Sequence, residues 1–321
     1  MSKNAWASTS RSSPVPSLPA IRRSRGAMSA RSPRSYVRIQ LIVQSGGICP
    51  AMLTIAIVAH NEEPYVGNAI RQAREAADTA TRVVVVDSAS TDGTAERARS
   101  LGCEVLPAPL GKGAAMVAMA SATETPWLCF MDADIVENGR NIPLTLRKAI
   151  DAAPESTAMV VADFDDPPPK PILSATISIY GPLVRALVPE ADGRFGDRPL
   201  SGFRAVRPEL LADDAPVDFG IEAYLNLSAA LTGRPVTLTH IGLFKQRFRY
   251  KADMGGEIGR AILDIAVKHG RLDPALRPEW DAWVDRILKV IRTYNGDLSQ
   301  AEAYLKRLYA AMEEPMPPRF P

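Results

Sequence analysis

Short, unbroken apolar runs alternate with segments of helical period from residue 53 onward, and this alternation constrains the fold more than any other feature of the chain. Runs of about four to eight residues that are rich in β-branched residues are typical of strands. A strand without polar interruption is expected to be covered on both faces, as in a parallel sheet between two layers of helices. Strands that alternate with helices indicate βαβ units. The sequence therefore predicts an α/β fold with a mainly parallel sheet flanked by helices.

The expected elements lie on either side of a Pro-rich break at 165–171 (DDPPPKP), which we interpret as a subdomain boundary. Before the break, strands are predicted at 53–59, 82–87, 103–107, 127–132 and 158–164. Helices are predicted at 64–77, 92–101, 114–122 and 141–151. Beyond the break, strands are predicted at 200–206 and 235–241, and helices at 219–232, 254–269, 277–294 and 298–313. The last three helices follow one another directly, which indicates a helical C-terminal extension.

The distribution of charge argues against a nucleic-acid partner. Residues 1–50 carry eight Lys and Arg and no acid, whereas residues 51–321 carry thirty Lys and Arg against thirty-six Asp and Glu. A nucleic-acid-binding surface normally needs a basic face that neutralises phosphates. The part of the chain that is expected to fold is mildly acidic, so no such surface is predicted.

The N-terminal segment, residues 1–51, is rich in Ser, Pro and Arg and offers little to bury. We interpret it as disordered, or as a mis-annotated extension ahead of a true start at Met52 or Met28. A targeting peptide is the alternative, since such peptides are rich in Arg and Ser and poor in acids. No apolar stretch of about seven residues closely follows Arg22 and Arg23, so the first interpretation is preferred.

Apolar patterning indicates no membrane span, because no apolar run reaches the roughly 18 residues that a span needs. An apolar stripe of helical period at 172–188, interrupted by Gly181-Pro182, is interpreted as core or interface. The alternative is a helix on a membrane surface, and with it peripheral membrane contact. The stripe lacks the Lys- and Arg-rich opposite face of such helices, which favours the core.

The three cysteines, Cys49, Cys103 and Cys129, have no paired spacing, and two of them fall in predicted strands. Buried thiols without a disulfide are therefore expected, as in a reducing compartment. This predicts a cytoplasmic location.

Three polar motifs directly follow or close predicted strands: AHNEE at 59–63, DSASTDGT at 87–94 and DAD at 132–134. Ligands of open α/β sheets bind beyond the carboxyl ends of the strands, so we expect the motifs to face one crevice. Mg²⁺ or Mn²⁺ neutralises a nucleoside diphosphate while few carboxylates hold the ion. Asp134 is predicted to bind such an ion directly. Asp132 is predicted to have a shared role, in contact with the ion and with a ribose.

Further polar residues surround this predicted crevice. Lys112 lies between two glycines at the start of a predicted helix, where a phosphate could meet both its ammonium and the first helical amides. Asp87 closes a buried strand and could accept from a base N–H or a ribose hydroxyl, with a local turn cap as the alternative. Asp92 fits a helix start better, so it is predicted to be structural. Glu62 is expected to bind nucleotide or to serve as a helix-start charge.

The runs IAIVAHNEEPYVGNAI, VVVVDSASTDGT, GKGAAM and LCFMDADI resemble, in this order, the first half of glycosyltransferase family 2 and its relatives. The resemblance spans roughly 53–135 and implies the GT-A fold and a nucleoside-diphosphate-sugar donor. It also implies which residues contact the donor nucleotide, and these are Ala59, Asn61, Glu62, Asp87, Ser88, Lys112 and Asp132.

A looser resemblance covers the second half. LSGFRAVRPELL (200–211) and DFGIEAYLNL (218–227) are similar to the acceptor half of glucosyl-3-phosphoglycerate synthase and its mannosyl counterparts. Polyprenyl-phosphate sugar transferases share parts of both motifs. The resemblance places Ser201, Gly202 and Glu222 beside the reacting sugar, with Ser201 and Gly202 in an acceptor-binding turn.

Other residues near this turn have open roles. Arg204 is expected to bind the acceptor, because it flanks the turn together with Arg207 and a guanidinium can grip a phosphate or carboxylate with two parallel hydrogen bonds. Surface pairing is the alternative for both arginines. Either Asp218 or Glu222 could take the proton of the acceptor hydroxyl if the family 2 resemblance dominates. If the synthase resemblance holds, Glu222 positions groups and the sugar keeps its configuration.

The third metal ligand is a departure from the synthase pattern. The synthases place a histidine ligand after the strand that follows this helix, whereas here His240 comes early and Lys245 or Gln246 occupies the aligned position. His240 therefore stays a candidate ligand, with a satisfied histidine at the end of a strand as the alternative. Without it, coordination would fall to carboxylates and water.

The resemblance divides the chain at the boundaries read from the pattern. Residues 52–250 are predicted to be a GT-A catalytic domain, with a nucleotide-binding half at 52–165 and an acceptor half at 166–250. Residues 251–321 are the helical C-terminal extension. A homodimer is left open.

The sequence thus predicts a metal-dependent hexosyltransferase that moves a sugar from a UDP-glucose or GDP-mannose type donor to a small phosphorylated acceptor such as 3-phosphoglycerate. A transferase that uses polyprenyl phosphate or another lipid phosphate is the nearest alternative. A nucleotidyltransferase would need a Gly-rich basic loop after the first strand, where AHNEE is acidic. A non-catalytic nucleotide-sugar binding protein is the alternative outside enzymes, although Asp132 and Asp134 are both present.

Overall fold

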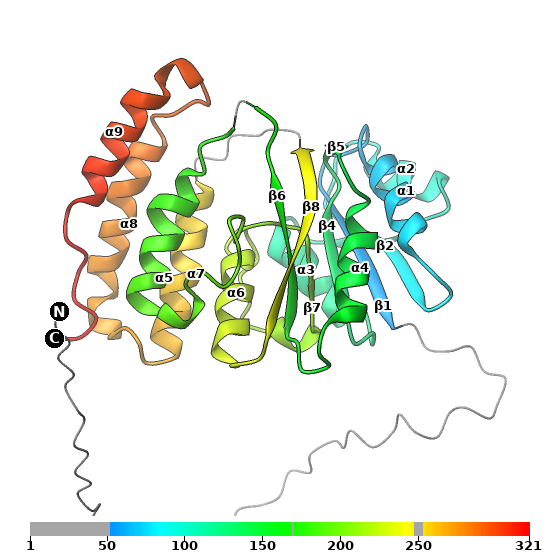
Figure 1. Cartoon of the computed structure of the whole chain (residues 1–321), viewed down its shortest axis with the longest axis horizontal. Coiled ribbons are helices and arrows are strands. Elements are labelled where there is room, and N and C mark those ends of the chain that lie inside the picture. Colours follow the sequence, from blue (N-terminus) through cyan, green and yellow to red (C-terminus); the bar gives the residue numbers. More distant parts are fainter. Residues whose placement is uncertain (1–51, 169, 247–252) are drawn as a thin grey trace, which may run out of the picture. The chain divides into compact units, whose positions relative to one another are not determined.

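The computed structural model describes residues 52–168, 170–246 and 253–321 (Figure 1). All of the described residues belong to one compact unit. The predictions for residues 1–51, Cys49 included, lie outside the described residues. None of the helices in these ranges is long and apolar enough to cross a membrane.

One mixed sheet forms the centre of this unit, with the strand order β3-β2-β1-β4-β7-β6-β8-β5. Its strands are β1 Leu53–Ala59, β2 Thr81–Ser88, β3 Glu104–Ala108, β4 Leu128–Asp132, β5 Ile135–Asn138, β6 Met159–Asp165, β7 Arg204–Val206 and β8 Val236–Gln246. Strands β3, β2, β1 and β4 are parallel to one another. Strand β7 runs antiparallel between β4 and β6, and β5 runs antiparallel to β8. The predicted α/β fold is confirmed.

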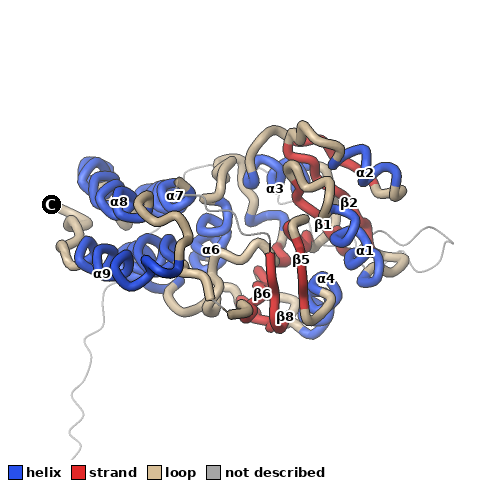
Figure 2. Tube along the Cα trace, turned by 90° about the horizontal axis from the view of Figure 1, so that it is seen from above, coloured by secondary structure: helices blue, strands red, loops and turns tan. Residues whose placement is uncertain are grey.

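Helices cover both faces of the sheet (Figures 1 and 2). They are α1 Val66–Ala76, α2 Thr94–Ser100, α3 Lys112–Ser121, α4 Ile142–Ala152, α5 Gly181–Leu187, α6 Ile221–Leu231, α7 Met254–Lys268, α8 Arg277–Ile291 and α9 Ala301–Met312. Short 3₁₀ turns lie at Pro189–Ala191, Pro208–Leu210, Pro274–Leu276 and Leu298–Gln300. The helical extension predicted for the C-terminus corresponds to α7, α8 and α9, which lie beside α5 and α6 in Figure 1.

The unbroken apolar strands supply two separate cores. Along β1, Ile55 and Ile57 point into a core shared with α1 and α4, whereas Ala56 points into a core shared with α3 and α6. In β4, Cys129 and Phe130 divide between the two cores in the same way. Side chains alternate across a strand, so a strand covered by helices on both sides must be apolar at every position. This is the physical origin of the pattern seen in the sequence.

The apolar stripe predicted at 172–188 forms a short π-helix, Thr176–Tyr180, which continues directly into α5. Pro182 lacks an N–H, so a regular α-helical bond to the carbonyl four residues earlier cannot form there. Instead, the amide of Gly181 donates to the carbonyl of Thr176, five residues earlier. Ile179 and Leu183 are fully buried, which confirms the prediction that the stripe belongs to the core.

Two differences in the strands change what reaches the ligand-binding edge. Strand β5, Ile135–Asn138, was not predicted because it follows Asp134 without a turn and contains no apolar run. Strand β8 extends to Gln246, beyond the predicted end at 241, because it pairs with β5 through Gln246 and Phe244. The strand predicted at 200–206 begins only at Arg204, since the preceding residues form a turn.

The two described cysteines are free and buried, as predicted. Burial raises the pKa of the Cys129 thiol to about 12 and also raises the pKa of Cys103.

In a Cys49→Ser background we therefore expect folded protein at pH 8 to resist a water-soluble thiol reagent, because roughly one Cys129 in ten thousand is a thiolate at that pH. Denaturant should expose both thiols. Rapid labelling of Cys129 without denaturant would contradict this packing, and peptide mass spectrometry identifies the labelled residue.

Candidate functional site

The carboxyl ends of the first strands meet at one edge of the sheet. The register pairs Ala59 with Asp87 and Val58 with Asp132, so the three predicted motifs lie side by side. A crevice of about 880 Å³ opens there. The polar side chains that line it include His60, Glu62, Ser88, Lys112, Asp132, Asp134, Ser201 and Glu222. The convergence predicted from strand order is therefore present.

The loop after β1 is tied to the loop after β2 through Asn61. This residue has a left-handed backbone with φ of 56°, a conformation that Asn tolerates better than most residues. Its backbone N–H donates to Ser90 Oγ at 3.0 Å, and its Oδ1 accepts from the amide of Thr91 at 2.8 Å. Asn61 and Ala59 do not appear among the residues that line the crevice. The structure gives Asn61 a role in shaping the loop, and its predicted contact with nucleotide stays untested.

Asp92 has the structural role that the sequence predicted for it. Asp87, whose role the sequence left open, is placed differently. Asp92 Oδ1 accepts from the amide of Thr94 at 3.0 Å, and Oδ2 accepts from the amide of Glu63 at 3.3 Å, which is a structural role. Asp87 Oδ1 is buried and has no hydrogen-bond partner among the described residues. A buried oxygen without a donor is costly, so this atom is suited to accept from the N–H or O–H of a ligand.

The GKG loop packs against the acceptor half of the chain. A β-carbon on Gly111 would lie 2.2 Å from the carbonyl oxygen of Val217, so only glycine fits there. The amides of Gly113 and Ala114 donate to the carbonyls of Asp218 and Val217 at 3.2 and 2.9 Å. Two of the first amides of α3 are thus satisfied within the protein. The expectation that these helical amides bind a phosphate is wrong for both.

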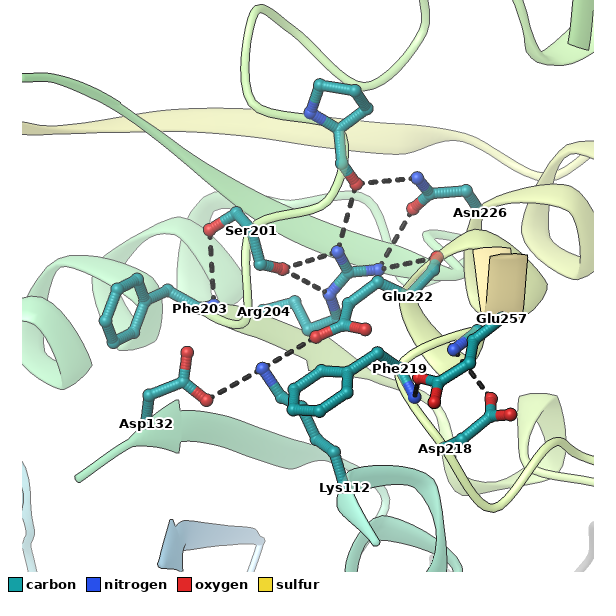
Figure 3. A network of polar contacts seen from close by, with 12 residues as sticks. Lys112, Asp132, Ser201, Phe203, Arg204, Asp218, Phe219, Glu222, Asn226 and Glu257 are labelled. Carbon is teal, nitrogen blue, oxygen red and sulfur yellow. Dashed lines mark hydrogen bonds and ion pairs between the residues drawn. The ribbon is translucent and has the colours of Figure 1, made fainter. Parts of the chain in front are cut away.

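Lys112 joins the end of β4 to the first turn of α6 across the crevice (Figure 3). Its Nζ lies 2.8 Å from Asp132 Oδ1 and 2.6 Å from Glu222 Oε1, and its side chain is 13% exposed. Burial alone lowers the pKa of Lys112, but the two negative charges outweigh it and raise the pKa above its ordinary value. Lys112 is therefore a permanent cation between two carboxylates.

The turn that precedes β7 comes close to this ion pair. A β-carbon on Gly202 would lie 2.3 Å from Asp132 Oδ2 and 2.6 Å from Lys112 Nζ. The neighbouring Ser201 Oγ accepts from the amide of Phe203 at 3.2 Å, which stabilises the turn. A side chain at position 202 would therefore require the Asp132 carboxylate and the Lys112 ammonium to move away from the turn.

The residues present fit a divalent cation that arrives with a phosphate ligand. Asp132 and Asp134 both line the crevice and supply hard oxygen ligands. The described residues contain no group of three or more His, Cys, Asp or Glu side chains placed to hold a metal ion. Two carboxylates are enough for such an ion, because Mg²⁺ in phosphate-transfer sites is held by one or two carboxylates together with substrate phosphates and water.

The structure does not bring His240, the predicted third metal ligand, together with Asp132 and Asp134. Its side chain is 51% exposed, and its Nε2 lies 3.5 Å from Asp165 Oδ2. Its Nδ1 accepts from the amide of Gly242 at 3.1 Å. His240 therefore pairs with the residue at the end of β6 and does not join Asp132. Of the two residues aligned with the synthase histidine, Lys245 lines the crevice.

The side chain of Gln246 is outside the described part of the structure.

The structure also separates the two carboxylates considered as bases. Asp218 Oδ1 accepts from the amide of Gly220 at 2.9 Å, and Oδ2 lies 3.5 Å from Arg260 Nη2. Asp218 is not among the crevice-lining residues, whereas Glu222 is. The carboxylate of Asp218 holds the turn before α6, and its predicted catalytic role stays untested.

Neither predicted acceptor-binding arginine is placed to bind a ligand. Arg204 is fully buried, and its guanidinium bonds to oxygens of the protein. Arg207 donates to the carbonyls of Thr157, Pro126 and Glu155, and stacks on a tryptophan ring. The guanidinium of Arg204 is thus occupied by oxygens of the protein, and Arg207, whose role was left open, is held by backbone carbonyls.

Asn226 is a member of the site that the sequence did not reveal. It is fully buried on α6, four residues after Glu222 and thus on the same helical face. Its Nδ2 donates to Tyr180 Oη at 3.0 Å and to the carbonyl of Pro199 at 2.7 Å. A lone amide within the apolar run AYLNLSAAL was the available signal.

Comparison with known families identifies the first half of the chain. Residues 54–184 match the model of the family described as Glycosyl transferase family 2. This part of the chain is therefore similar to family 2 glycosyltransferases. A search of curated protein sequences finds no match for the chain.

Solved structures show that the chain has a GT-A-like fold. Glucosyl-3-phosphoglycerate synthase from Mycobacterium tuberculosis, solved with Mn²⁺ and UDP-glucose, is 24% identical with a TM-score of 0.56, over 70% of this chain and 81% of that chain. Mannosyl-3-phosphoglycerate synthase from Rubrobacter xylanophilus is 23% identical with a TM-score of 0.58, over 70% of this chain and 76% of its own. At this identity, the likeness concerns the fold.

Replacing Gly202 tests the close packing of the glycosyltransferase site. In Gly202→Ala, the new methyl group would displace Asp132 and Lys112, because it would otherwise lie within 2.6 Å of both. We expect the affinity for Mn²⁺ in the presence of a nucleoside diphosphate to fall at least about tenfold, as when groups that orient a metal ligand are lost. Titration calorimetry measures this affinity.

Gly67→Ala is the matched control for this variant, because a β-carbon at Gly67 on α1 meets only ordinary van der Waals neighbours. It should bind Mn²⁺ as the unmodified protein does. Equal affinities for Gly202→Ala and Gly67→Ala would show that the approach of the turn to Asp132 has no bearing on ligand binding.

Proposed function

We propose that this enzyme transfers a hexose from a nucleoside-diphosphate sugar, of the UDP-glucose or GDP-mannose type, to the hydroxyl of a small phosphorylated acid, with Mg²⁺ or Mn²⁺ as cofactor. The observation that carries the proposal is the ion-paired cluster of Lys112 with Asp132 and Glu222. It joins the carboxyl end of β4 to the first turn of α6. A donor and an acceptor bound on these two sides would meet at Lys112.

A buried oxygen without a hydrogen-bond donor, at the end of β2, supports a donor site at this edge of the sheet. Asp87 Oδ1 lacks a partner among the described residues and suits an N–H of the base or a ribose hydroxyl. Asp132 and Asp134 would hold the cation. A divalent cation bound there offsets the negative charge that develops on a departing diphosphate. Lys112, a cation already at the crevice, can add a point charge beside the same phosphates.

The acceptor side is supported by the turn at Ser201 and Gly202 and by Glu222. Gly202 presents backbone without a side chain, so an acceptor can lie close to the donor sugar. Glu222 is paired with Lys112 at 2.6 Å, which fixes its position. This favours Glu222 as a group that orients the reacting hydroxyl over Glu222 as the proton acceptor. Correct orientation alone can account for a large part of a rate enhancement.

A lipid phosphate is the second acceptor class, and one observation favours it. Beyond the polar cluster, the crevice is lined by apolar side chains from the segment after β6, from α7 and from the turn after α8. Among these side chains are Ile172, Leu173, Met254 and Leu298. An isoprenoid chain would find apolar contacts there, whereas a small phosphorylated acid would leave this part of the crevice to water.

A matrix of donors and acceptors tests the proposal. The full chain is incubated with UDP-glucose or GDP-mannose and Mg²⁺, each with 3-phosphoglycerate, with polyprenyl phosphate or with no acceptor, and products are measured by mass spectrometry. We expect one donor–acceptor pair to give a glycosylated product, and chelation with EDTA to abolish it. Absence of product from every pair that includes a hexose donor would overturn the proposal.

Substitution of a predicted metal ligand gives the residue-level test. Asp134→Asn should lower turnover about 100-fold or more, because loss of groups that place a metal costs 10- to 100-fold even outside the direct ligands. Asp165→Asn is the control, since Asp165 is exposed, pairs with His240 and does not line the crevice. Its turnover should match that of the unmodified enzyme. Normal turnover in Asp134→Asn would refute the metal assignment.

A further inference from the structure

Arg204 is a fully buried arginine at the first position of β7, in the middle of the sheet. All five N–H groups of its guanidinium have acceptors (Figure 3). Nε and Nη2 donate to the carbonyl of Ser201, and Nη2 also donates to that of Pro199 at 3.1 Å. Nη1 donates to the carbonyl of Glu222 at 3.2 Å and to Asn226 Oδ1 at 3.0 Å. The guanidinium thus binds two segments at once.

These two segments carry the groups that meet across the crevice. Pro199 and Ser201 belong to the turn that places Gly202 against Asp132. Glu222 belongs to the first turn of α6, and its side chain reaches Lys112. A planar guanidinium holds its acceptors in a fixed fork, so it sets the spacing between the turn and the helix. The gap available to an acceptor is therefore fixed from behind by one side chain.

A buried positive charge such as that of Arg204 is unusual where its hydrogen bonds have only a structural role. None of the acceptors that the described residues offer to its guanidinium is a carboxylate. Burial of a charge without a bonded counter-ion is costly, and here burial lowers the pKa of Arg204 while the charges of Glu222 and Asp132 act in the opposite direction. Its counter-charges are thus the same carboxylates that Lys112 binds. Arg204 is coupled to the crevice by charge as well as by hydrogen bonds.

We infer that Arg204 is a positioning residue for glycosyl transfer, which sets the separation of the Gly202 turn from Glu222 and supplies a second fixed positive charge behind the two carboxylates. The inference rests on the proposed function of the crevice. Asn226 extends the device, because it accepts from Arg204 and donates to Pro199 and Tyr180. The carboxylate of Glu222 then keeps its place and a cationic neighbour when Lys112 turns to a bound diphosphate.

Arg207 provides a matched control on the same chain segment. It too is held by backbone carbonyls, those of Thr157, Pro126 and Glu155, and its guanidinium lies 4.1 Å from the ring centroid of Trp127. These partners lie at the opposite ends of the strands, since Trp127 precedes β4 and Thr157 precedes β6. Substitution of Arg207 therefore removes a similar structural tie away from the crevice.

The test compares Arg204→Lys and Arg204→Met with Arg207→Lys and Arg207→Met in the full chain. Arg204→Met should lower kcat about 100-fold, the loss expected from a misplacement of about 1 Å, with the KM for donor changed less than about twofold. Arg204→Lys should recover part of this loss, because it restores the charge without the fork. When compared at an equal loss in Tm, the two Arg207 variants should keep the kcat of the unmodified enzyme. If Arg204→Met does not fold, the two Lys variants carry the comparison.

A kcat within about twofold of the unmodified enzyme in both Arg204 variants would overturn the inference, as would equal losses of kcat in the Arg204 and Arg207 variants at equal Tm. If the unmodified enzyme transfers no sugar, the proposed function has failed and hydrogen–deuterium exchange decides the positioning role. In Arg204→Lys, the amides of Ser201, Phe203 and Asn226 should exchange faster than in Arg207→Lys. Unchanged exchange at all three would refute the inference.

Discussion

One buried ammonium bound to two carboxylates is the constraint on which the site depends. Lys112 starts α3, Asp132 ends β4 and Glu222 lies in the first turn of α6, so the pairing ties together segments that are far apart in the sequence. Each charge would be costly to bury alone, because the low dielectric of the interior penalises an unpaired charge. The three are tolerated together, with Arg204 as the second cation of the group. Any movement of one element changes the environment of the others.

The surrounding backbone is arranged so that this cluster can form. Gly111 and Gly113 allow the start of α3 to lie directly on the carbonyls of residues 216–218, and Gly202 lets a turn lie directly on Asp132. Side chains at these positions would separate the donor and acceptor halves by the width of a methyl group or more. The glycines therefore have one physical purpose, which is close approach between two segments of this protein. That purpose differs from the phosphate contact that a glycine-flanked lysine suggests in a sequence.

The sequence predicted the fold and the donor edge because both follow from local pattern. Strands buried on both faces are apolar throughout, and polar residues at their carboxyl ends mark the crevice, so Asp132, Asp134 and Lys112 could be recognised from order alone. The local sequence could not show which distant segment a polar side chain meets in the folded protein. The pairings of His240 with Asp165 and of Asp218 with Arg260 could not be foreseen, because the partners are 75 and 42 residues away. Arg204 looked like a ligand-binding arginine because its burial depends on strand pairings that no local pattern reveals.

Strand β7 also affects how the protein must assemble. It contributes only Arg204–Val206, yet it fills the place between β4 and β6, which have no pairing with each other. During synthesis, both neighbours leave the ribosome before the strand that joins them, so for a time each exposes a row of unsatisfied N–H and C=O groups. An interrupted chain ending near residue 165 would keep those bare edges and invite pairing with other molecules. The central sheet is therefore complete only when the second half of the chain has been made.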